Sequence, residues 1–133
     1  MAGDSTTGTR RRVLIVEDED NIAIALDYLM SREGYEHDRI ATGAGALDAI
    51  RKLHPDLVLL DVMLPEVSGY EICQEVRADR GLADVKILMM TARGSAMERR
   101  KGIALGADGF IAKPFELKEL RDEVHRLLEP GAR

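Results

Sequence analysis

The sequence contains few of the residues that build disulfides, cysteine metal sites or aromatic stacking surfaces. It has a single cysteine, Cys73, and no tryptophan, and its aromatic residues are three tyrosines and two phenylalanines. One cysteine excludes an intrachain disulfide and a multi-cysteine zinc site, and it is typical of a reducing compartment. The scarcity of aromatic residues disfavours surfaces that stack on the bases of single-stranded nucleic acid, and it requires an aliphatic core.

Long apolar segments are also missing. No run approaches the ~20 apolar residues of a membrane-spanning helix. The first residues, Met-Ala-Gly-Asp-Ser-Thr-Thr-Gly, lack the apolar centre of a secretion signal. We therefore expect no membrane segment and a cytoplasmic location.

Length and charge restrict the class of protein further. At about 150 residues per domain, a chain of 133 residues forms one domain. Its net charge is −5 although Arg10, Arg11 and Arg12 lie together near the start, so the remainder is more acidic still. Binding to a phosphate backbone requires a basic surface, and we expect no direct nucleic-acid binding by this chain.

Short apolar runs alternate with helical patterns along the chain. The runs predict strands at 13–16, 35–40, 57–60, 86–90 and 110–112. The apolar stripes expected on the inner faces of four helices are Ile22, Ala25, Leu26 and Leu29; Ala46, Ala49, Ile50 and Leu53; Ile72, Cys73 and Val76; and Leu117, Leu120, Val124 and Leu127. Gly34 is a candidate helix stop and Thr42 a candidate N-cap, while residues 97–105 form a weakly amphipathic helix. Strands alternating with helices predict a parallel sheet covered on both faces.

Polar residues follow the predicted strands. They are Glu17 and Asp18 after the first strand, Asp61 after the third, Thr91 after the fourth and Lys113 after the fifth. The carboxyl ends of parallel strands share one edge, so these residues can form one pocket. Three adjacent carboxylates repel one another, and either protonation or a bound cation relieves the repulsion. Oxygen ligands without histidine or cysteine favour Mg²⁺, and Mg²⁺ with a lysine and a threonine suits a phosphoryl group.

Four segments resemble one known family. They are Val-Leu-Ile-Val-Glu-Asp-Glu at 13–19, Leu-Val-Leu-Leu-Asp-Val-Met-Leu-Pro at 57–65 followed by Gly69, Met-Met-Thr-Ala at 89–92, and Gly-Ala-Asp-Gly-Phe-Ile-Ala-Lys-Pro-Phe at 106–115. In this order they are similar to the receiver (response regulator) domain of two-component signal transduction. The resemblance covers about residues 12–128.

The resemblance implies a doubly wound α/β fold, (βα)5, of the flavodoxin-like or CheY-like type. Its five-stranded parallel sheet would have the order 2-1-3-4-5, with helices on both faces. Residues 1–11 would form a flexible N-terminal tail, residues 12–129 the receiver domain, and residues 130–133 a C-terminal tail without an effector domain.

The resemblance also implies roles for the residues at the strand ends. Asp61 would be the phosphoacceptor, taking its phosphoryl group from a sensor histidine kinase or a histidine phosphotransfer protein, so the chain would be a signalling switch and not an enzyme. Asp18, Asp61 and the backbone carbonyl of Met63 would bind Mg²⁺, with Mn²⁺ a possible substitute, and Glu17 would act mainly through water.

Further implied roles concern the switch. Lys113 would pair with Asp61 and then with the phosphoryl oxygens, and the Lys113–Pro114 bond would be cis. Thr91 would move towards the phosphoryl group while Phe110 turns inward, altering the surface of the helix at 97–105, the fifth strand and the last helix. Met63, Ala92 and Arg93 would tune the access of water and so the phosphoryl lifetime.

Several alternatives stay open. Thr91 could be a helix cap, Phe110 could be an ordinary core residue, and Glu19 and Asp20 are interpreted as a solvated charge run. A phosphatase of the haloacid-dehalogenase type also uses an aspartate nucleophile, but it needs a second aspartate two residues later, where this chain has Met63. A degenerate receiver that only docks is disfavoured because all five expected polar positions are present.

The output is expected to pass through a downstream protein target or through an effector domain that this chain lacks. Gly109 and Glu123 depart from the pattern of receivers that dimerise through the fourth-helix to fifth-helix face. Their interchain ion pair could not form, so we expect a monomer or a weak phosphorylation-dependent dimer.

Overall fold

The computed structural model describes residues 11–92 and 95–129. The expected tails at 1–11 and 130–133 therefore lie outside the described residues, apart from Arg11. The elements, in chain order, are β1 (Arg12–Val16), α2 (Asp20–Arg32), β2 (Glu36–Ile40), α3 (Ala46–Leu53), β3 (Leu57–Asp61), α4 (Gly69–Ala78), a 3-10 turn (Arg80–Leu82), β4 (Lys86–Thr91), α5 (Ala96–Ala104), β5 (Gly109–Ala112) and α6 (Leu117–Leu128). Each strand lies within one residue of its expected position at either end.

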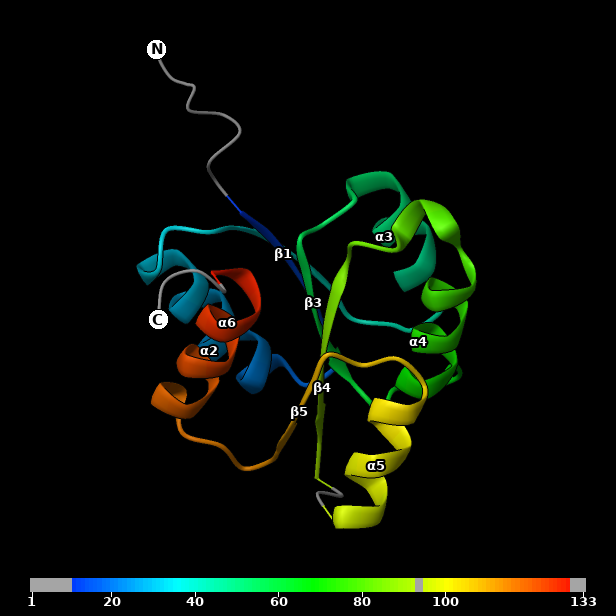
Figure 1. The fold of residues 1–133 in the computed structure, drawn as a ribbon. Coiled ribbons are helices and arrows are strands. Elements are labelled where there is room, and N and C mark those ends of the chain that lie inside the picture. The colour runs from blue at the N-terminus through cyan, green and yellow to red at the C-terminus, as the bar shows by residue number, and fades with distance from the viewer. Residues whose placement is uncertain (1–10, 93–94, 130–133) are drawn as a thin grey trace.

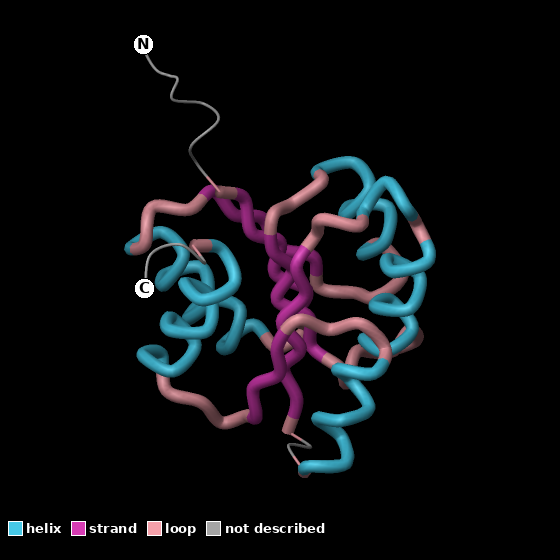
Figure 2. The backbone as a smooth tube through the Cα atoms, in the orientation of Figure 1, coloured by secondary structure: helices cyan, strands magenta, loops and turns pink. Residues whose placement is uncertain are grey.

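The strands form one parallel sheet in the order β2-β1-β3-β4-β5, which confirms the expected topology. Helices α2 and α6 cover one face of the sheet, and α3, α4 and α5 cover the other (Figures 1 and 2). All the strands run in the same direction, so their carboxyl ends meet at one edge, the lower edge in Figure 1. Among the described residues, no helix is long and apolar enough to cross a membrane.

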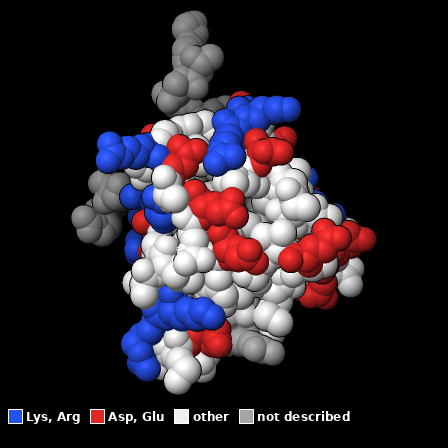
Figure 3. Space-filling view, turned by 90° about the vertical axis from the view of Figure 1, so that its right-hand side faces the viewer, with Lys and Arg blue, Asp and Glu red and all other residues white. Residues whose placement is uncertain are grey.

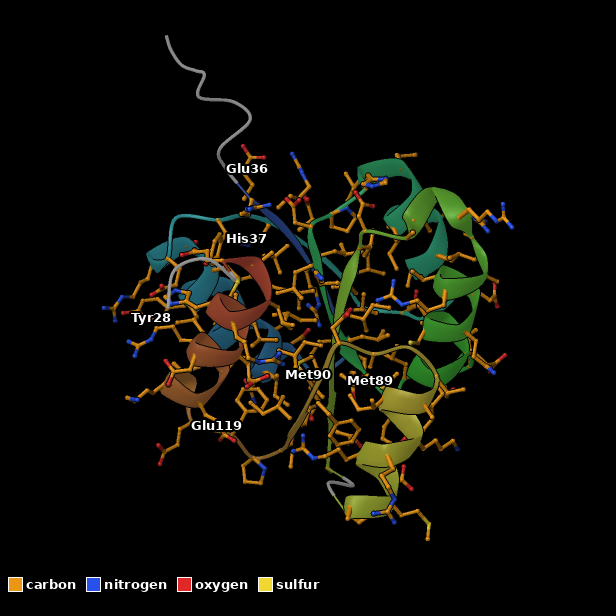
Figure 4. All side chains as sticks on the ribbon, in the orientation of Figure 1. Tyr28, Glu36, His37, Met89, Met90 and Glu119 are labelled. Atoms are coloured by element: carbon orange, nitrogen blue, oxygen red, sulfur yellow. The ribbon has the colours of Figure 1, made fainter. Side chains whose placement is uncertain are left out.

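The core consists of two aliphatic layers, one on each side of the sheet. All of β3 is buried, as are the four residues of β1 from Val13 to Val16. Successive residues of a strand point to opposite faces: Met89 packs with the α3–α5 layer and Met90 with the α2–α6 layer (Figure 4). This burial on both faces explains why the central strands appear in the sequence as uninterrupted apolar runs.

The expected inner stripe of α2 is wrong by one position. The buried residues of α2 are Ala23, Leu26, Leu29 and Met30, whereas Ile22 and Ala25 are only partly buried. Both sets contain Leu26 and Leu29 at helical spacing, so periodicity alone does not distinguish them, and the contact with the sheet selects the rotation. The expected stripe of α6 also differs at one position: Leu117 is 38% exposed, whereas Leu128, which was not expected in the stripe, is buried.

The cap expected at Thr42 is also wrong. Thr42 is exposed, and α3 begins at Ala46 with Gly45 as its N-cap. A turn at 43–45 precedes the helix instead. Gly43 in this turn packs against Val67, and a Cβ on Gly43 would lie 2.5 Å from the Val67 carbonyl oxygen. Gly34, by contrast, follows α2 with φ +84°, as a helix stop requires.

Helix α5 has a shallow contact with the sheet. Gly102 is its only buried residue, and Met97 and Ile103 are 70% and 46% exposed. A Cβ on Gly102 would lie 2.8 Å from the Met89 sulfur and 3.1 Å from the ring of Phe110. Helix α5 therefore contacts these two side chains at Gly102, and it buries little apolar surface of its own.

Strand β2 is an edge strand whose five residues are all half-buried. Arg12 of the neighbouring strand donates to Glu36 at 2.7 Å and to Asp38 at 2.9 Å. These cross-strand ion pairs hold β2 against β1 where no second strand covers it.

We predict that the Cys73 thiol reacts with alkylating reagents only when the chain unfolds. Cys73 is fully buried, and burial raises the pKa of its thiol to about 11. Alkylation of the native protein at pH 8 should be slower than that of the denatured protein by on the order of a thousandfold or more, because reaction requires opening of the core. Stability should fall as the pH rises from 9 towards 11, since the unfolded thiol ionises first. Native labelling within tenfold of the denatured rate would contradict this prediction.

Candidate functional site

The carboxyl edge of the sheet brings four strand ends together. Glu17 and Asp18 follow β1, Asp61 ends β3, Thr91 ends β4 and Lys113 follows β5. Strands β1, β3, β4 and β5 are consecutive neighbours in the sheet. Residues almost 100 positions apart are thereby placed in one site, as the strand-end argument predicts.

Three carboxylates form the centre of this site. One oxygen from each of Glu17, Asp18 and Asp61 lies within 4.8 Å of the others. Glu17 is 0% exposed and Asp61 is 3% exposed, whereas Asp18 is exposed. The cluster is therefore open to solvent on the side of Asp18 and closed by the sheet on the side of Glu17.

Lys113 is the cation of the site. Its Nζ donates to Glu17 Oε1 at 2.9 Å and lies 3.4 Å from Asp61 Oδ1. The Lys113–Pro114 peptide bond is cis, and the Lys113 backbone N–H donates to the Thr91 carbonyl at 2.8 Å. The lysine thus bridges two carboxylates. It forms the pair with Asp61 that the family resemblance implied, but its shorter contact is with Glu17.

Burial dominates the electrostatics of the two inner carboxylates. It raises the pKa of Asp61, and the Asp18 carboxyl adds to this, although the Met63 N–H bond at 3.1 Å and Lys113 act in the opposite direction. Burial likewise raises the pKa of Glu17, although the hydrogen bond from Lys113 acts to lower it. For Lys113, burial alone would lower the pKa, but the contacts with Glu17 and Asp61 outweigh it and the net shift is upward.

The donor set fits a hard divalent cation. Three carboxylates face one lysine, so negative charge is in excess in a poorly solvated pocket. All the ligand atoms are oxygens, and one of the three residues is exposed to water, which suits Mg²⁺ because it keeps several of its water ligands. The cluster is thus chemically matched to the metal that the sequence indicates.

The remaining residues singled out from the sequence lie around this cluster or beyond it. Thr91 is fully buried, Met63 is 50% exposed and Ala92 is exposed. Phe110 is only 3% exposed and already lies inward, beneath Arg99, whose guanidinium carbon is 5.4 Å from the ring centre. Arg93 lies outside the described residues.

Sequence reasoning missed two arginines. Arg39, next to last in β2, donates from Nε and Nη2 to the Glu17 carbonyl at 3.0 and 2.8 Å. Arg77 of α4 donates to the Gly106 carbonyl at 2.8 Å and to Asp108 at 2.7 Å, and so joins α4 to the turn before β5. The position of Arg39 at the carboxyl end of a predicted strand is a signal that could have drawn attention to it.

Comparisons with known proteins agree with this geometry. The chain matches the model of the response regulator receiver domain over residues 13–125. The DNA-binding response regulator MtrA of Mycolicibacterium smegmatis is 42% identical over 119 residues, which are 90% of this chain and 51% of MtrA. The chain spans about half the length of the curated relatives that it matches.

Solved structures give the same result. The chemotaxis response regulator CheY4 of Vibrio cholerae has a TM-score of 0.84 and 31% identity, with 90% of this chain and 99% of that chain covered. The receiver domain of the sensor histidine kinase PA1611 of Pseudomonas aeruginosa has a TM-score of 0.81 and 27% identity, covers 90% of this chain and 98% of that one, and has a magnesium ion coordinated in its active site cleft. With a matching sequence model, sheet order and acidic pocket, the chain belongs to the response regulator receiver family and is a phosphoacceptor signalling switch.

Proposed function

We propose that Asp61 is the phosphoacceptor of this chain and that the acidic cluster binds Mg²⁺ for the transfer. The observation that carries the proposal is the meeting of three carboxylates with Lys113, whose Nζ lies 3.4 Å from Asp61 Oδ1. Asp61 is the one member of the cluster that ends a central strand, so its carboxylate is fixed in place while a phosphodonor approaches from solvent.

In the proposed transfer, a carboxylate oxygen of Asp61 attacks the phosphorus atom of a phosphohistidine in a sensor histidine kinase or a histidine phosphotransfer protein. The new O–P bond forms as the P–N bond breaks, and the electron pair of that bond stays on the ring nitrogen. A phosphohistidine already protonated on its other ring nitrogen leaves as neutral imidazole, and an unprotonated one takes up a proton from solvent to become neutral. Lys113 offsets charge on the phosphoryl oxygens. The Met63 N–H, which donates to Asp61 Oδ1, orients the carboxylate.

Asp18, Asp61 and the Met63 carbonyl would hold the metal directly, with Glu17 acting through water, and Mn²⁺ could replace Mg²⁺. When bound, the metal neutralises charge on the carboxylates and on the incoming phosphoryl group. Met63 is exposed two residues after Asp61, and Ala92 is exposed directly after Thr91. Their positions support a role in tuning the access of attacking water. We extend the same role to Arg93.

The proposed switch connects Thr91 and Phe110 to the surface formed by α5, β5 and α6. Movement of the buried Thr91 towards the phosphoryl group would change the packing around Phe110, against which Gly102 of α5 rests. The shallow seat of α5 supports this proposal, because a helix with a single buried residue can shift without exposing much apolar surface.

We propose that the output is a protein contact or an attached effector domain, and not nucleic-acid binding by this chain. On the face of α3, α4 and α5, basic side chains lie in separate groups with acidic groups between them (Figure 3). Glu123 pairs with Arg126 of the same helix at 2.8 Å, which supports a monomer or a weak phosphorylation-dependent dimer. The single, buried Cys73 supports a cytoplasmic location.

The test is the intact mass of the wild-type chain after incubation with a small acyl phosphate. With Mg²⁺ we expect an adduct of one phosphoryl group that maps to the peptide containing Asp61, and with the chelator EDTA we expect none. An adduct on another residue, or equal labelling in EDTA, would overturn the proposal. Steady hydrolysis of phosphomonoesters would favour the phosphatase alternative, which already lacks its second carboxylate because Met63 occupies that position.

A further inference from the structure

Arg39 connects the edge strand β2 to the loop that carries two residues of the acidic cluster. Its side chain is 26% exposed, so most of the side chain is enclosed by the protein. It lies at the same edge of the sheet as the cluster, because β2 runs parallel to β1 and its Arg39 is paired in register with Ile15.

All three nitrogens of the guanidinium bind the segment that runs from the end of β1 to the first residue of α2. Nε and Nη2 donate to the Glu17 carbonyl oxygen at 3.0 and 2.8 Å, and Nη1 lies 3.0 Å from Asp20 Oδ1. These contacts hold the backbone before Asp18 and the side chain two residues after it. One planar group thereby spans the segment 17–20.

This arrangement determines where the two carboxylates of the segment lie. The Glu17 side chain is held at its two oxygens by Lys113 and by the Glu19 N–H at 3.0 Å, and Arg39 fixes its backbone. The Asp18 side chain is exposed, so few packing contacts hold its carboxylate in place. The direction of this carboxylate depends on the backbone at 17–20, and Arg39 restrains that backbone. Lysine could not reproduce these contacts, because it lacks the fixed fork of donors.

We propose that Arg39 is a positioning residue for the metal site: it holds residues 17–20 so that the carboxylates of Glu17 and Asp18 stay directed towards Asp61. The inference rests on the proposed binding of Mg²⁺. It predicts an effect on metal affinity whose sign is the opposite of a simple charge effect. Removing a positive charge near a cation site should tighten Mg²⁺ binding, whereas loss of positioning should weaken it.

The experiment measures the Mg²⁺ dissociation constant from the rise in thermal unfolding temperature with Mg²⁺ concentration. For Arg39→Gln we expect the constant to increase about tenfold, and Arg39→Lys should restore little of the affinity although it restores the charge. Arg51→Gln is the matched control, because Arg51 also has one carboxylate partner, Asp79 at 3.1 Å, but lies on α3. Its affinity should equal that of the wild type.

A second variant keeps the proposal testable if Arg39→Gln fails to fold. Asp20 is 83% exposed, so Asp20→Asn should fold and should weaken Mg²⁺ binding about twofold to threefold by loosening one arm of the contact. In the metal-free chain, the Glu19 amide should exchange its hydrogen faster in Arg39→Gln than in the wild type. Unchanged or tighter Mg²⁺ binding in Arg39→Gln would overturn the positioning role, whereas a wild-type chain that Mg²⁺ does not stabilise would overturn the proposed function itself.

Discussion

Asp61→Asn will take up no phosphoryl group, and in metal-free buffer at pH 7 it will be more stable than the wild type by about 1–2 kcal/mol. The amide keeps an oxygen to accept the Met63 N–H but removes one of three clustered negative charges. Lys113 retains its shorter contact, with Glu17. The loss of phosphorylation follows because an amide oxygen is a poor nucleophile.

The sign of the stability change follows from the pKa of Asp61. Burial raises this pKa in the folded state, so the folded protein holds the proton more tightly than the unfolded chain does. Above the raised pKa, the charged carboxylate therefore destabilises the fold. The advantage of asparagine should shrink as the pH is lowered through that raised pKa and should be gone once the pH is below the ordinary pKa of an aspartate. Mg²⁺ should also reduce the advantage, because it stabilises the wild type by binding its folded state.

Denaturant unfolding in EDTA and in Mg²⁺, with intact mass for the adduct, measures both effects. Asp84→Asn is the control: Asp84 is 80% exposed and pairs with His54 near the opposite edge of the sheet. It should phosphorylate normally and leave the stability close to that of the wild type, because Asp84 is exposed. A phosphorylated Asp61→Asn chain, or one less stable than the wild type without metal, would contradict the prediction.

Gly69→Ala should destabilise the protein by about 2–3 kcal/mol and weaken Mg²⁺ binding. Helix propensity alone predicts the opposite, a gain of about 1 kcal/mol for alanine over glycine. The structure reverses this, because a Cβ on Gly69 would lie 2.5 Å from the carbonyl oxygen of Asp61 and 2.8 Å from the Cα of Val62. Both are backbone atoms, so relief requires movement of the chain that carries Asp61.

Gly45→Ala is the matched control for this effect. Gly45 also lies at the N-terminus of a helix, but its nearest neighbours to a Cβ are side-chain atoms of Thr42 and Ile40 at 3.9 and 4.0 Å. Chemical unfolding and Mg²⁺ titration of the two variants should therefore separate the close approach of α4 to β3 from the general effect of replacing a glycine. Equal behaviour of the two variants would show that the backbone contact has no energetic consequence.

The sequence predicted the sheet well because its central strands are buried on both faces. Residues 13–16 and 57–60 have no polar positions, and these aliphatic runs are too short for a buried helix, so their length favours strands. The rotation of α2 was not predictable in the same way, because two overlapping stripes share Leu26 and Leu29. Which stripe faces the sheet depends on how the helix crosses it, and local sequence does not contain that information.

For the site, strand-end position identified which residues meet but not which side chains touch. Lys113 was expected beside Asp61, yet its shorter contact is with Glu17. Arg39 was not selected, because its contact is with the carbonyl oxygen of the residue that follows the neighbouring strand. Its place at the carboxyl end of a predicted strand could have marked it as a candidate, but the sequence does not show which backbone atom an arginine contacts.

The charges on the edge strand β2 have a consequence beyond the site. An edge strand presents unpaired backbone groups that can recruit another chain, and natural proteins discourage this with charged residues along the edge. Four of the five residues of β2, Glu36, His37, Asp38 and Arg39, are polar or charged. The strand that carries Arg39 therefore also discourages extension of the sheet by a second copy. Replacing its charged residues with apolar ones should add a tendency to aggregate to any effect on the proposed metal site.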